Sequence, residues 1–426
     1  MVRVPGLRRP PGPFRPEFWR SPLRGPWLTS VLGSLLLAGL VLVVATGFAS
    51  HAAYAPGLGR NGIVDPSRDL PLTTFDWPTS PAWLYAATQG VHVVLGIALV
   101  PLLLAKLWSV FPRLFAWPPV RSPAQAVERA SLALLVGGVA FQFVTGIVNA
   151  QVYYPFRFNF VVAHYYGAVV FTAALLAHVA VKLPTVRRAY RERGVLAPLR
   201  EDLAHTRPEP SDPDGGLAPV APADPTLSRR GLLAFAAGGS GLLLVTTAGQ
   251  VVGGPLRKLA LLSPRGTQPG AGPNGFQVNK TAHAAGIRRE RTGAGWRLEV
   301  VGGARALALS RADLLALPQR TESLPIACVE GWSTTQSWTG VQLAELARMV
   351  GAQGRPLRVE SLQPRGVLRE ATLTAGQVTD ERSLLALRVN GADLSLDHGF
   401  PARIVVPALP GVHCTKWVAR MTFVAS

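Results

Sequence analysis

Cys328 is the residue of this 426-residue chain whose type and setting point most directly to metal chemistry. It lies between the apolar residues 324–327 and the turn-forming residues 331–333, and Cys414 is the only other cysteine. A single thiolate is a soft ligand, suited to a metal whose remaining donors come from a cofactor. The alternatives are a structural cysteine buried in a core and a disulfide with Cys414, which would remove the ligand. We interpret Cys414 as structural.

Histidines in apolar segments form the second group with ligand chemistry. Ionisable side chains inside a membrane are costly and commonly functional. His164 and His178 share one segment and are 14 positions apart. On a helix this spacing places them within about 40° of one face and roughly 21 Å apart along the axis, which suits two haems, one near each membrane face. The four histidines in or beside such segments are His51, His92, His164 and His178.

We expect one haem b with His92 and His164 as its axial pair, because both lie inside their segments at similar depth. His51 ends its segment and is the other candidate partner of His164, or else it caps the helix or faces a quinone pocket. His178 is the candidate ligand of a second haem, although the first three segments offer it no partner histidine near the inner face. The alternative is a bundle whose histidines hydrogen-bond to other groups and bind no haem.

Long apolar runs must position these histidines. Apolar residues make up 48% of the chain and gather in blocks, five of which are long enough to cross a hydrocarbon core of about 30 Å. We therefore expect a membrane protein with soluble parts. The five runs are residues 28–49, 84–108, 130–150, 160–181 and 232–252.

The distribution of the formal net charge of +19 predicts topology. Residues 1–26 carry six Arg and one Glu, and residues 182–200 carry six Lys or Arg and one Glu. In residues 50–83, by contrast, three Asp outnumber two Arg. The positive-inside rule then places the N-terminus in the cytoplasm and returns the chain there after four spans. We expect a multi-pass protein of the cell membrane, with the lipid bilayer as partner and no nucleic acid.

Arg229 and Arg230 directly precede the fifth run, which is mildly apolar and rich in Ala and Gly. This arrangement resembles a twin-arginine export signal placed inside the chain, a route taken by proteins that are already folded, typically around a cofactor. The alternative is a pair of ordinary positive-inside arginines. Both interpretations put residues 254–426 outside the cytoplasm.

Composition divides the chain into six expected parts, with Pro- and Gly-rich linkers between them. These parts are a cytoplasmic basic tail (1–26), a four-span membrane domain (27–184), a cytoplasmic linker (185–228), the twin-arginine-like signal with the fifth span (229–253), a second linker (254–275) and a C-terminal domain of ordinary soluble composition (276–426).

The last part has a mixed pattern of strands and helices. Residues 296–300 alternate like a strand, and residues 310–317 begin like a capped helix. Residues 340–350 form an amphipathic helical pattern, and residues 402–407 read as a short buried strand. The predicted fold class is a multi-pass α-helical membrane bundle followed by an α+β extracytoplasmic domain without a Rossmann or P-loop glycine motif.

Two family resemblances follow from these features. Residues 27–184 resemble, in histidine placement and span count, the four-helix membrane cytochrome b subunits of hydrogenases and formate dehydrogenases. Residues 276–426 resemble the sulfite-oxidase-type molybdenum cofactor domain, and the CVEGWS motif looks like that of the catalytic subunit of the periplasmic protein-methionine-sulfoxide reductase. The motifs are CVEGWS from Cys328, VNGADL (389–394), HGFPARIVVP (398–407) and KW (416–417).

The second resemblance implies roles for five residues. Cys328 would be the thiolate ligand of molybdenum, beside the dithiolene of one molybdopterin. His398, Arg403 and Lys416 align with positions that hold the pterin and its phosphate, and Arg and Lys are suitable phosphate donors. Asn279 lies near the point where the family's early loop approaches the cofactor.

Two departures lead away from sulfite oxidation. Sulfite oxidases follow the ligand Cys with a Gly/Asn/Arg-rich segment that helps to bind the anionic substrate, whereas Val-Glu-Gly-Trp follows Cys328 here. We also expect no immunoglobulin-like dimerisation domain after Trp417. Glu330 is the second candidate catalytic residue; it and Trp332 line the pocket or pack behind it.

The expected function is a molybdopterin-dependent oxidoreductase in the membrane. Quinol or another membrane donor reduces haem b, electrons pass outward to the molybdenum site, and an S-oxide such as methionine sulfoxide, small or protein-bound, or an N-oxide loses its oxygen atom. One alternative runs the same path in reverse, oxidising sulfite or a similar donor and reducing quinone. Another is a non-catalytic binding module that keeps only the molybdenum fold.

Overall fold

The computed structural model describes residues 9–54, 76–118, 120, 122–210, 217–303 and 305–424. The first residues of the basic tail (1–8), most of the acidic connection between the first two runs (55–75) and part of the cytoplasmic linker (211–216) lie outside the described residues.

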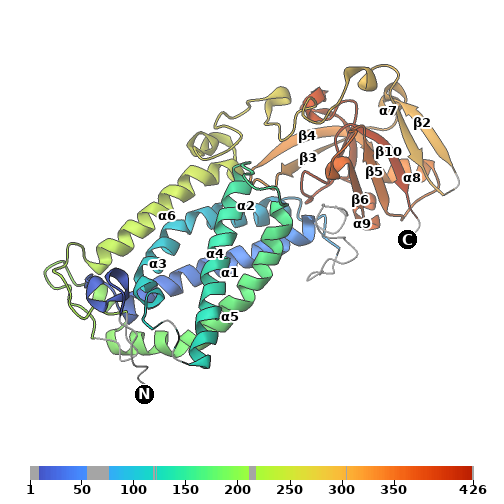
Figure 1. Cartoon of the computed structure of the whole chain (residues 1–426). Helices are drawn as coiled ribbons and strands as arrows, with labels where there is room; N and C mark the ends of the chain where they lie inside the picture. Colours follow the sequence, from blue (N-terminus) through green and yellow to red (C-terminus); the bar gives the residue numbers. More distant parts are fainter. Residues whose placement is uncertain are drawn as a thin grey trace. The chain divides into compact units, whose positions relative to one another are not determined.

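Helices form over all five apolar runs (Figure 1). Four helices are long and apolar enough to cross a membrane. A fifth candidate is a bent pair of shorter helices. The helices are α1 (Pro26–Tyr54), α2 (Leu84–Ala98), α3 (Val100–Leu114), α4 (Pro123–Ala150), α5 (Phe160–Arg193) and α6 (Arg229–Val252).

The second run differs from the single straight span that its hydropathy predicts. It breaks at Leu99 into α2 and α3, whose axes are bent by 44°. Pro101 explains the break, since proline has no N–H to donate and its ring clashes with the preceding turn of a helix. Proline is tolerated in the first turn of a new helix, where it lies in α3.

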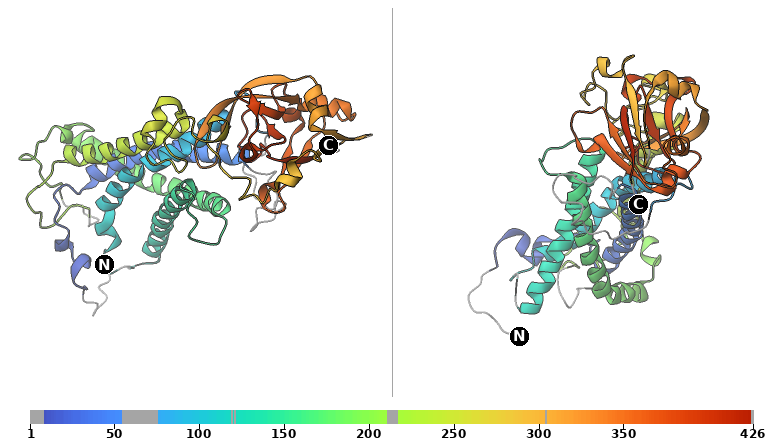
Figure 2. Two further views of the ribbon diagram at one scale, coloured as in Figure 1. Left: turned by 90° about the horizontal axis from the view of Figure 1, so that it is seen from above. Right: turned by 90° about the vertical axis from the view of Figure 1, so that its right-hand side faces the viewer.

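The chain divides into two compact units. The first contains Met1–Val44, Leu95–Gly146 and His164–Leu244, and it is helical. The second contains Ala45–Val94, Ile147–Ala163 and Val245–Ser426, so it includes the last turns of α1 and α6, most of α2 and all the strands. The strands, coloured orange to red, gather in one body in every view (Figure 2).

Two five-stranded sheets make up the strand-rich part. One has the order β2-β1-β10-β5-β6, with β1 and β10 parallel and the other pairs antiparallel. The other has the order β3-β4-β7-β8, with β9 also paired to β7, and all its pairs are antiparallel. The strands are β1 (Arg297–Val301), β2 (Ala306–Ser310), β3 (Arg320–Ala327), β4 (Ser333–Gln342), β5 (Leu357–Ser361), β6 (Glu370–Leu373), β7 (Leu384–Val389), β8 (Ala392–Asp393), β9 (Arg403–Val405) and β10 (Val418–Phe423).

Three short helices complete this part: α7 (Arg311–Ala316), α8 (Leu343–Met349) and α9 (Ala375–Thr379). The predicted capped helix is confirmed, because the Ser310 hydroxyl accepts from the backbone N–H of Asp313 and the Asp313 carboxylate accepts from that of Ser310. The strands predicted at residues 296–300 and 402–407 are confirmed as β1 and β9. The helix predicted from residue 340 begins only at Leu343, because residues 340–342 pair with β7.

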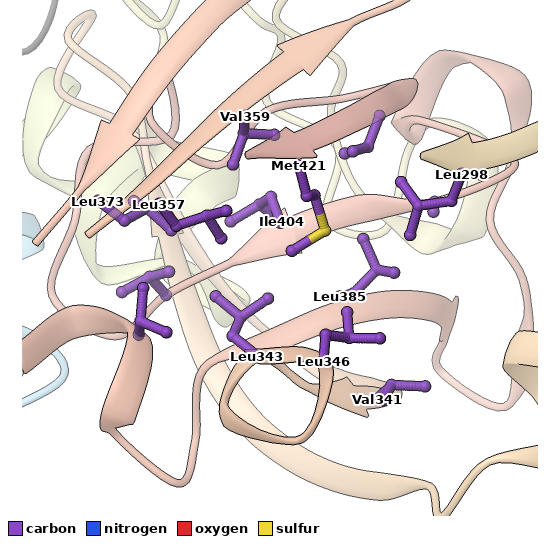
Figure 3. Close-up of a cluster of buried hydrophobic side chains, with 14 of the residues drawn as sticks. Leu298, Val341, Leu343, Leu346, Leu357, Val359, Leu373, Leu385, Ile404 and Met421 are labelled. Carbon is purple, nitrogen blue, oxygen red and sulfur yellow. The ribbon is translucent and has the colours of Figure 1, made fainter. Parts of the chain in front are cut away.

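Side chains from both sheets meet in one buried core (Figure 3). Leu357 and Met421 reach it from the first sheet, Leu385 from the second, and Leu346 from α8. Each such buried side chain stabilises the fold by about 1.5–3 kcal/mol relative to exposure. Within the same unit, Ala52 and Ala53 of α1, Tyr85 of α2 and Trp77, which precedes α2, extend this core.

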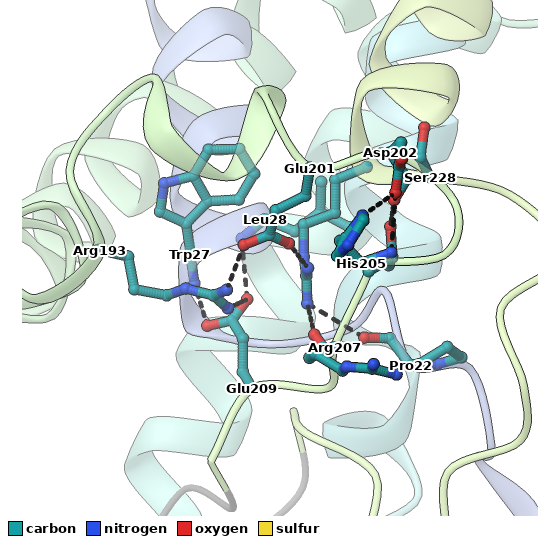
Figure 4. Close-up of polar contacts among 12 residues, drawn as sticks. Pro22, Trp27, Leu28, Arg193, Glu201, Asp202, His205, Arg207, Glu209 and Ser228 are labelled. Carbon is teal, nitrogen blue, oxygen red and sulfur yellow. Dashed lines mark hydrogen bonds and ion pairs between the residues drawn. The ribbon is translucent and has the colours of Figure 1, made fainter.

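A polar network joins the start of α1 to the linker that follows α5 (Figure 4). Glu209, in the linker that follows α5, accepts hydrogen bonds from the backbone N–H groups of Trp27 (2.9 Å) and Leu28 (3.5 Å) at the start of α1. A carboxylate at the start of a helix accepts from N–H groups that have no partner within the helix, and its negative charge interacts favourably with the positive end of the helix dipole. Arg229 joins the network through Glu201, at 3.0 Å.

Candidate functional site

Cys328 lies at the tip of the β3–β4 hairpin. Strand pairing ends where Ala327 meets Ser333, and the intervening residues form a tight turn in which the Cys328 N–H donates to Trp332 O (2.9 Å) and the Gly331 N–H donates to Cys328 O (3.0 Å). Gly331 has φ +87°, a conformation that favours glycine. The hairpin therefore holds the thiol in a fixed, buried position.

Glu330, in the same turn, is buried, and both of its carboxylate oxygens accept hydrogen bonds. Its carboxylate receives two hydrogen bonds from Arg265, at 2.9 Å from Nε and 2.6 Å from the terminal nitrogen, and a third from Trp332 Nε1 at 2.8 Å. The side chain thus ties the Cys328 turn to the linker that carries Arg265. A catalytic role for Glu330 stays a prediction.

Burial, followed by the negative charge of Glu330, raises the pKa of the Cys328 thiol to about 12. Arg265 opposes this shift. Without a cation the sulfur therefore keeps its proton at neutral pH, whereas a bound metal stabilises the thiolate. Both cysteines are free, so the disulfide alternative is wrong.

The predicted cofactor-binding residues come together on neighbouring segments. Lys416 Nζ donates to Asn279 Oδ1 at 3.1 Å, which joins the early loop to the segment before β10. Arg403, the first residue of β9, donates weakly to the backbone oxygen of His398 at 3.4 Å. Gly399 links both pairs, since a Cβ there would lie 3.1 Å from the Cβ of Lys416 and 3.2 Å from that of Arg403.

Arg403 is a cation without adequate partners in the described part of the chain. Its side chain is 3% exposed, its Nε has no hydrogen-bond partner, and its guanidinium lies 5.4 Å from the centre of the Trp338 ring. Buried arginines normally pair with anions, because an unpaired buried charge is costly. A phosphate or similar anion would satisfy this group.

Burial acts on the whole cluster in the same direction. It lowers the pKa of Arg403 to about 10, lowers that of His398 to about 4, and lowers that of Lys416 well below its usual value. An anionic group in their midst would oppose these shifts by favouring the charged forms. Lys416 is also within electrostatic reach of Cys328. A soft sulfur donor next to buried phosphate-type donors fits the chemistry of a molybdenum–molybdopterin group.

His398 has a defined tautomer. Its Nε2 faces two acceptors, Pro273 O at 2.8 Å and Phe276 O at 3.2 Å, so the ring proton is on Nε2 and Nδ1 carries the lone pair. The ring stacks on Phe276 with centroids 3.7 Å apart. His398 is accordingly held neutral and rigid beside Arg403.

The candidate haem ligands lie on three helices: His51 on α1, His92 on α2, and His164 with His178 on α5. Gly47 of α1 faces His92, and a Cβ at that glycine would lie 2.7 Å from the ring. The pairing of His92 with His164 stays a prediction.

Thr145 of α4 sets the tautomer of His164. Its hydroxyl donates to Phe141 O at 2.6 Å and lies 2.8 Å from His164 Nδ1. Because a hydroxyl has one proton, Nδ1 must be the donor to Thr145, which leaves the lone pair on Nε2. Histidines that bind a metal through one ring nitrogen commonly donate the other N–H to such an acceptor. Gly146 also faces His164, and a Cβ there would lie 3.2 Å from the imidazole ring.

Sequence reasoning missed several residues of the site. Arg265 is the only charged residue of residues 262–275, and that isolation could have marked it. Gln89 and Tyr85 of α2 belong to the same unit as Cys328; Gln89 bonds to the Cys328 turn, and Tyr85 is within electrostatic reach of the thiol. No local pattern marks Gln89, Tyr85 or Phe276.

The comparisons with known proteins concern this part of the chain. Residues 285–426 match the family described as "Oxidoreductase molybdopterin binding domain". The C-terminal part is thus a sulfite-oxidase-type molybdopterin-binding domain, and the chain carries an oxidoreductase enzyme domain. The match includes Cys328, His398, Arg403 and Lys416, whereas Asn279 precedes it.

Three individual proteins are similar to part of this chain. The chain is 31% identical to mitochondrial sulfite oxidase of Rattus norvegicus over 156 residues, covering 30% of this chain and 29% of that protein. It is 32% identical over 130 residues to the uncharacterized oxidoreductase YuiH of Bacillus subtilis, covering 30% of this chain and 65% of YuiH. The sulfane dehydrogenase SoxCD structure from Paracoccus pantotrophus is 26% identical, with a TM-score of 0.28, over 30% of this chain and 38% of that chain. The chain thus matches less than a third of the length of the rat enzyme.

Proposed function

We propose that the chain is a membrane-bound oxidoreductase that passes electrons between a quinone pool, haem b and an extracytoplasmic molybdenum–molybdopterin site, and that it reduces S-oxides such as methionine sulfoxide, or N-oxides. The observation that carries the proposal is the buried Cys328 in one compact unit with the underpaired Arg403 and with the ends of apolar helices.

The chain's own residues have distinct tasks. Cys328 supplies the sulfur ligand, and Arg403 and Lys416 hold the anionic end of the cofactor. When bound, the molybdenum–molybdopterin group supplies two-electron oxygen-atom transfer, and haem supplies single-electron transfer. The overall reaction consumes an S-oxide, two electrons and two protons, and it yields a sulfide and water.

Topology supports the location in the membrane. The ends of α1 and α6 and the start of α2 share a unit with the molybdopterin-binding domain, while the opposite ends of α1 and α6 belong to the other unit. In a multi-pass bundle whose catalytic domain lies on one side of the membrane, the helix ends on that side group with the domain and the opposite ends do not. The positive-inside rule assigns that side to the outside.

The test uses purified full-length protein reduced with dithionite. Adding methionine sulfoxide should reoxidise the haem, and Cys328→Ala should lose this reoxidation. Cys414→Ser is the matched control, because Cys414 is also buried and free. Haem that stays reduced in the wild-type protein would contradict S-oxide reduction, and protein without molybdenum would favour the binding-module alternative.

Similarity to sulfite oxidase favours one second candidate, the oxidation of sulfite with electrons passing inward. Sulfite added to the oxidised protein should then reduce the haem. The Val-Glu-Gly-Trp sequence after Cys328 is the feature that disfavours this direction.

A further inference from the structure

The turn that carries Cys328 is bound directly to helix α2, within one compact unit. The Gln89 side-chain amide donates to the backbone oxygen of Val329 at 2.7 Å. One helical turn further along, Val93 packs so closely on Gly331 that a Cβ there would lie 2.7 Å from the valine Cβ. Residues four apart share a helix face, so one face of α2 holds the turn.

Helix α6 completes the junction. The hydroxyl of Ser333 donates to the backbone oxygen of Val251 at 2.8 Å. Val251 in turn packs on Gly90 of α2, where a Cβ would lie 2.5 Å from the valine side chain. The Cys328 turn, α2 and α6 therefore meet without room for an additional side chain.

The same turn of α2 carries His92, the residue directly before Val93. Its ring points to a different neighbour, Gly47 of α1. Gln89, His92 and Val93 thus lie within five consecutive positions of α2. The candidate haem ligand, His92, faces α1, whereas Gln89 and Val93 contact the turn that carries Cys328.

We propose that residues 89–93 of α2 form the electron-transfer junction between a haem held at His92 and the metal site at Cys328, with Gln89 as the positioning residue that keeps the Cys328 turn on the helix. The proposal rests on the proposed function and adds the route to it. Each passage oxidises one ferrous haem to ferric haem and delivers one electron. Two passages and two protons complete the reduction of one S-oxide to a sulfide and water.

The loss of the Gln89 hydrogen bond should affect the junction and not the metal site. Val329 O lies in a buried turn, and the loss of its donor would leave a polar group unsatisfied. The turn would then be held on α2 by the packing of Val93 alone, while the hairpin, the Arg265–Glu330 pair and the cofactor-binding cluster would keep their own contacts. Weakening the junction should therefore slow electron entry and leave the metal site formed.

The experiment compares Gln89→Leu with Gln151→Leu in the full-length protein. Gln151 is a matched control because its side-chain amide also donates to a backbone oxygen of a later segment, Leu262 O at 2.9 Å, and not to the Cys328 turn. Molybdenum and haem contents are measured first. Two rates follow: S-oxide reduction with a soluble reduced viologen dye, and reoxidation of reduced haem by methionine sulfoxide.

Gln89→Leu should retain both cofactors and the dye-linked reaction, while haem reoxidation should slow by roughly tenfold, the scale of one buried hydrogen bond. Gln89→Lys, which keeps a donor, should recover part of the rate. Unchanged haem reoxidation in Gln89→Leu would overturn the route, as would loss of molybdenum or of the dye-linked reaction, which would make Gln89 a structural support of the site. A wild-type protein that lacks haem or reduces no oxide with the dye would instead refute the proposed function.

Discussion

Arg265 and Glu330, 65 positions apart in the chain, form a two-pronged ion pair directly beside the Cys328 turn. The Glu330 side chain is 8% exposed and that of Arg265 is 25% exposed, so the pair is largely shielded from water. It joins the linker at residues 262–275 to the hairpin that carries the metal ligand. The pair therefore couples the stability of the linker to the geometry of the site.

Arg265→Met should destabilise the protein by about 3 kcal/mol, because it leaves the Glu330 carboxylate buried without its cation. Arg265→Met combined with Glu330→Gln should recover part of this loss, since the unpaired charge is then gone. Thermal unfolding of the two single variants and the double variant measures the coupling. The control is Arg358→Met, which breaks an exposed pair with Glu370 and should cost less than about 1 kcal/mol.

The same variants address the predicted catalytic role of Glu330. If Glu330→Gln retains molybdenum and turnover at a temperature where it is folded, the residue positions the turn. If it keeps the fold and the metal but loses turnover, the residue takes part in the reaction.

Acid should destabilise the cofactor-free protein through His398. Burial, followed by the charge of Arg403, lowers its pKa from 6.5 to about 4 in the folded state. Between these values the unfolded chain binds the proton and the folded chain does not, so stability is present above about pH 6.5 and is lost as the pH falls toward 4. The loss should reach about 3 kcal/mol, given 1.36 kcal/mol per pKa unit.

Thermal unfolding from pH 7.5 to 4.5, in protein from a host without molybdopterin, measures this effect. The relevant quantity is the difference between wild type and His398→Gln, because burial also lowers the pKa of His413. His283→Gln, at an exposed position, should keep the wild-type profile. Parallel profiles for wild type and His398→Gln would contradict the prediction.

Thr145→Val should weaken haem binding if His164 is an axial ligand. The substitution removes the acceptor for Nδ1–H and leaves the ring orientation unsupported. Loss of such a partner typically costs about 10–100-fold in metal affinity. Haem content and the haem midpoint potential report the change. Thr172→Val is the matched control, because the buried Thr172 hydroxyl has no hydrogen-bond partner among the described residues. Equal haem content and potential in the two variants would contradict the prediction.

Local patterns and motifs were enough to select residues that the structure brings together at the candidate site. Cys328, Arg403 and Lys416 lie in contiguous motifs, and the Ser310 cap needs only a residue three positions away. Asn279, the least supported of the predicted residues, does contact Lys416. The motif residues and the cap follow from neighbouring residues, which a single sequence displays, whereas the Asn279–Lys416 contact joins residues 137 positions apart.

Contacts between distant segments could not be predicted in this way. Arg265 with Glu330 and Gln89 with Val329 depend on how the linker and α2 pack against the hairpin, and no periodicity encodes that packing. The late start of α8 has the same origin, since pairing with β7 extends β4 over residues that have a helical pattern. Pro101 is a local signal for the helix break, but the continuous hydropathy of residues 84–108 predicts a single span.

Substitutions of Arg229 and Arg230 should distinguish a twin-arginine signal from a pair of ordinary positive-inside arginines. Arg229 is fully buried and bonded to Glu201 (3.0 Å), Arg207 O (2.6 Å) and Pro22 O (3.2 Å), whereas Arg230 is exposed. Arg229→Gln should therefore lower the stability of the helical unit by about 3 kcal/mol, and Arg230→Gln should change it by less than about 0.5 kcal/mol.

Export should instead depend on both arginines if they form a twin-arginine signal. A twin-arginine signal needs both arginines, so each substitution should reduce the amount of C-terminal domain that protease digests in intact spheroplasts. Ordinary positive-inside arginines are redundant with the other basic residues that precede α6, so Arg230→Gln would then leave export unchanged. We expect Arg230→Gln to reduce export without loss of stability, and normal export in that variant would establish that the pair acts only through charge and, at Arg229, through the buried network.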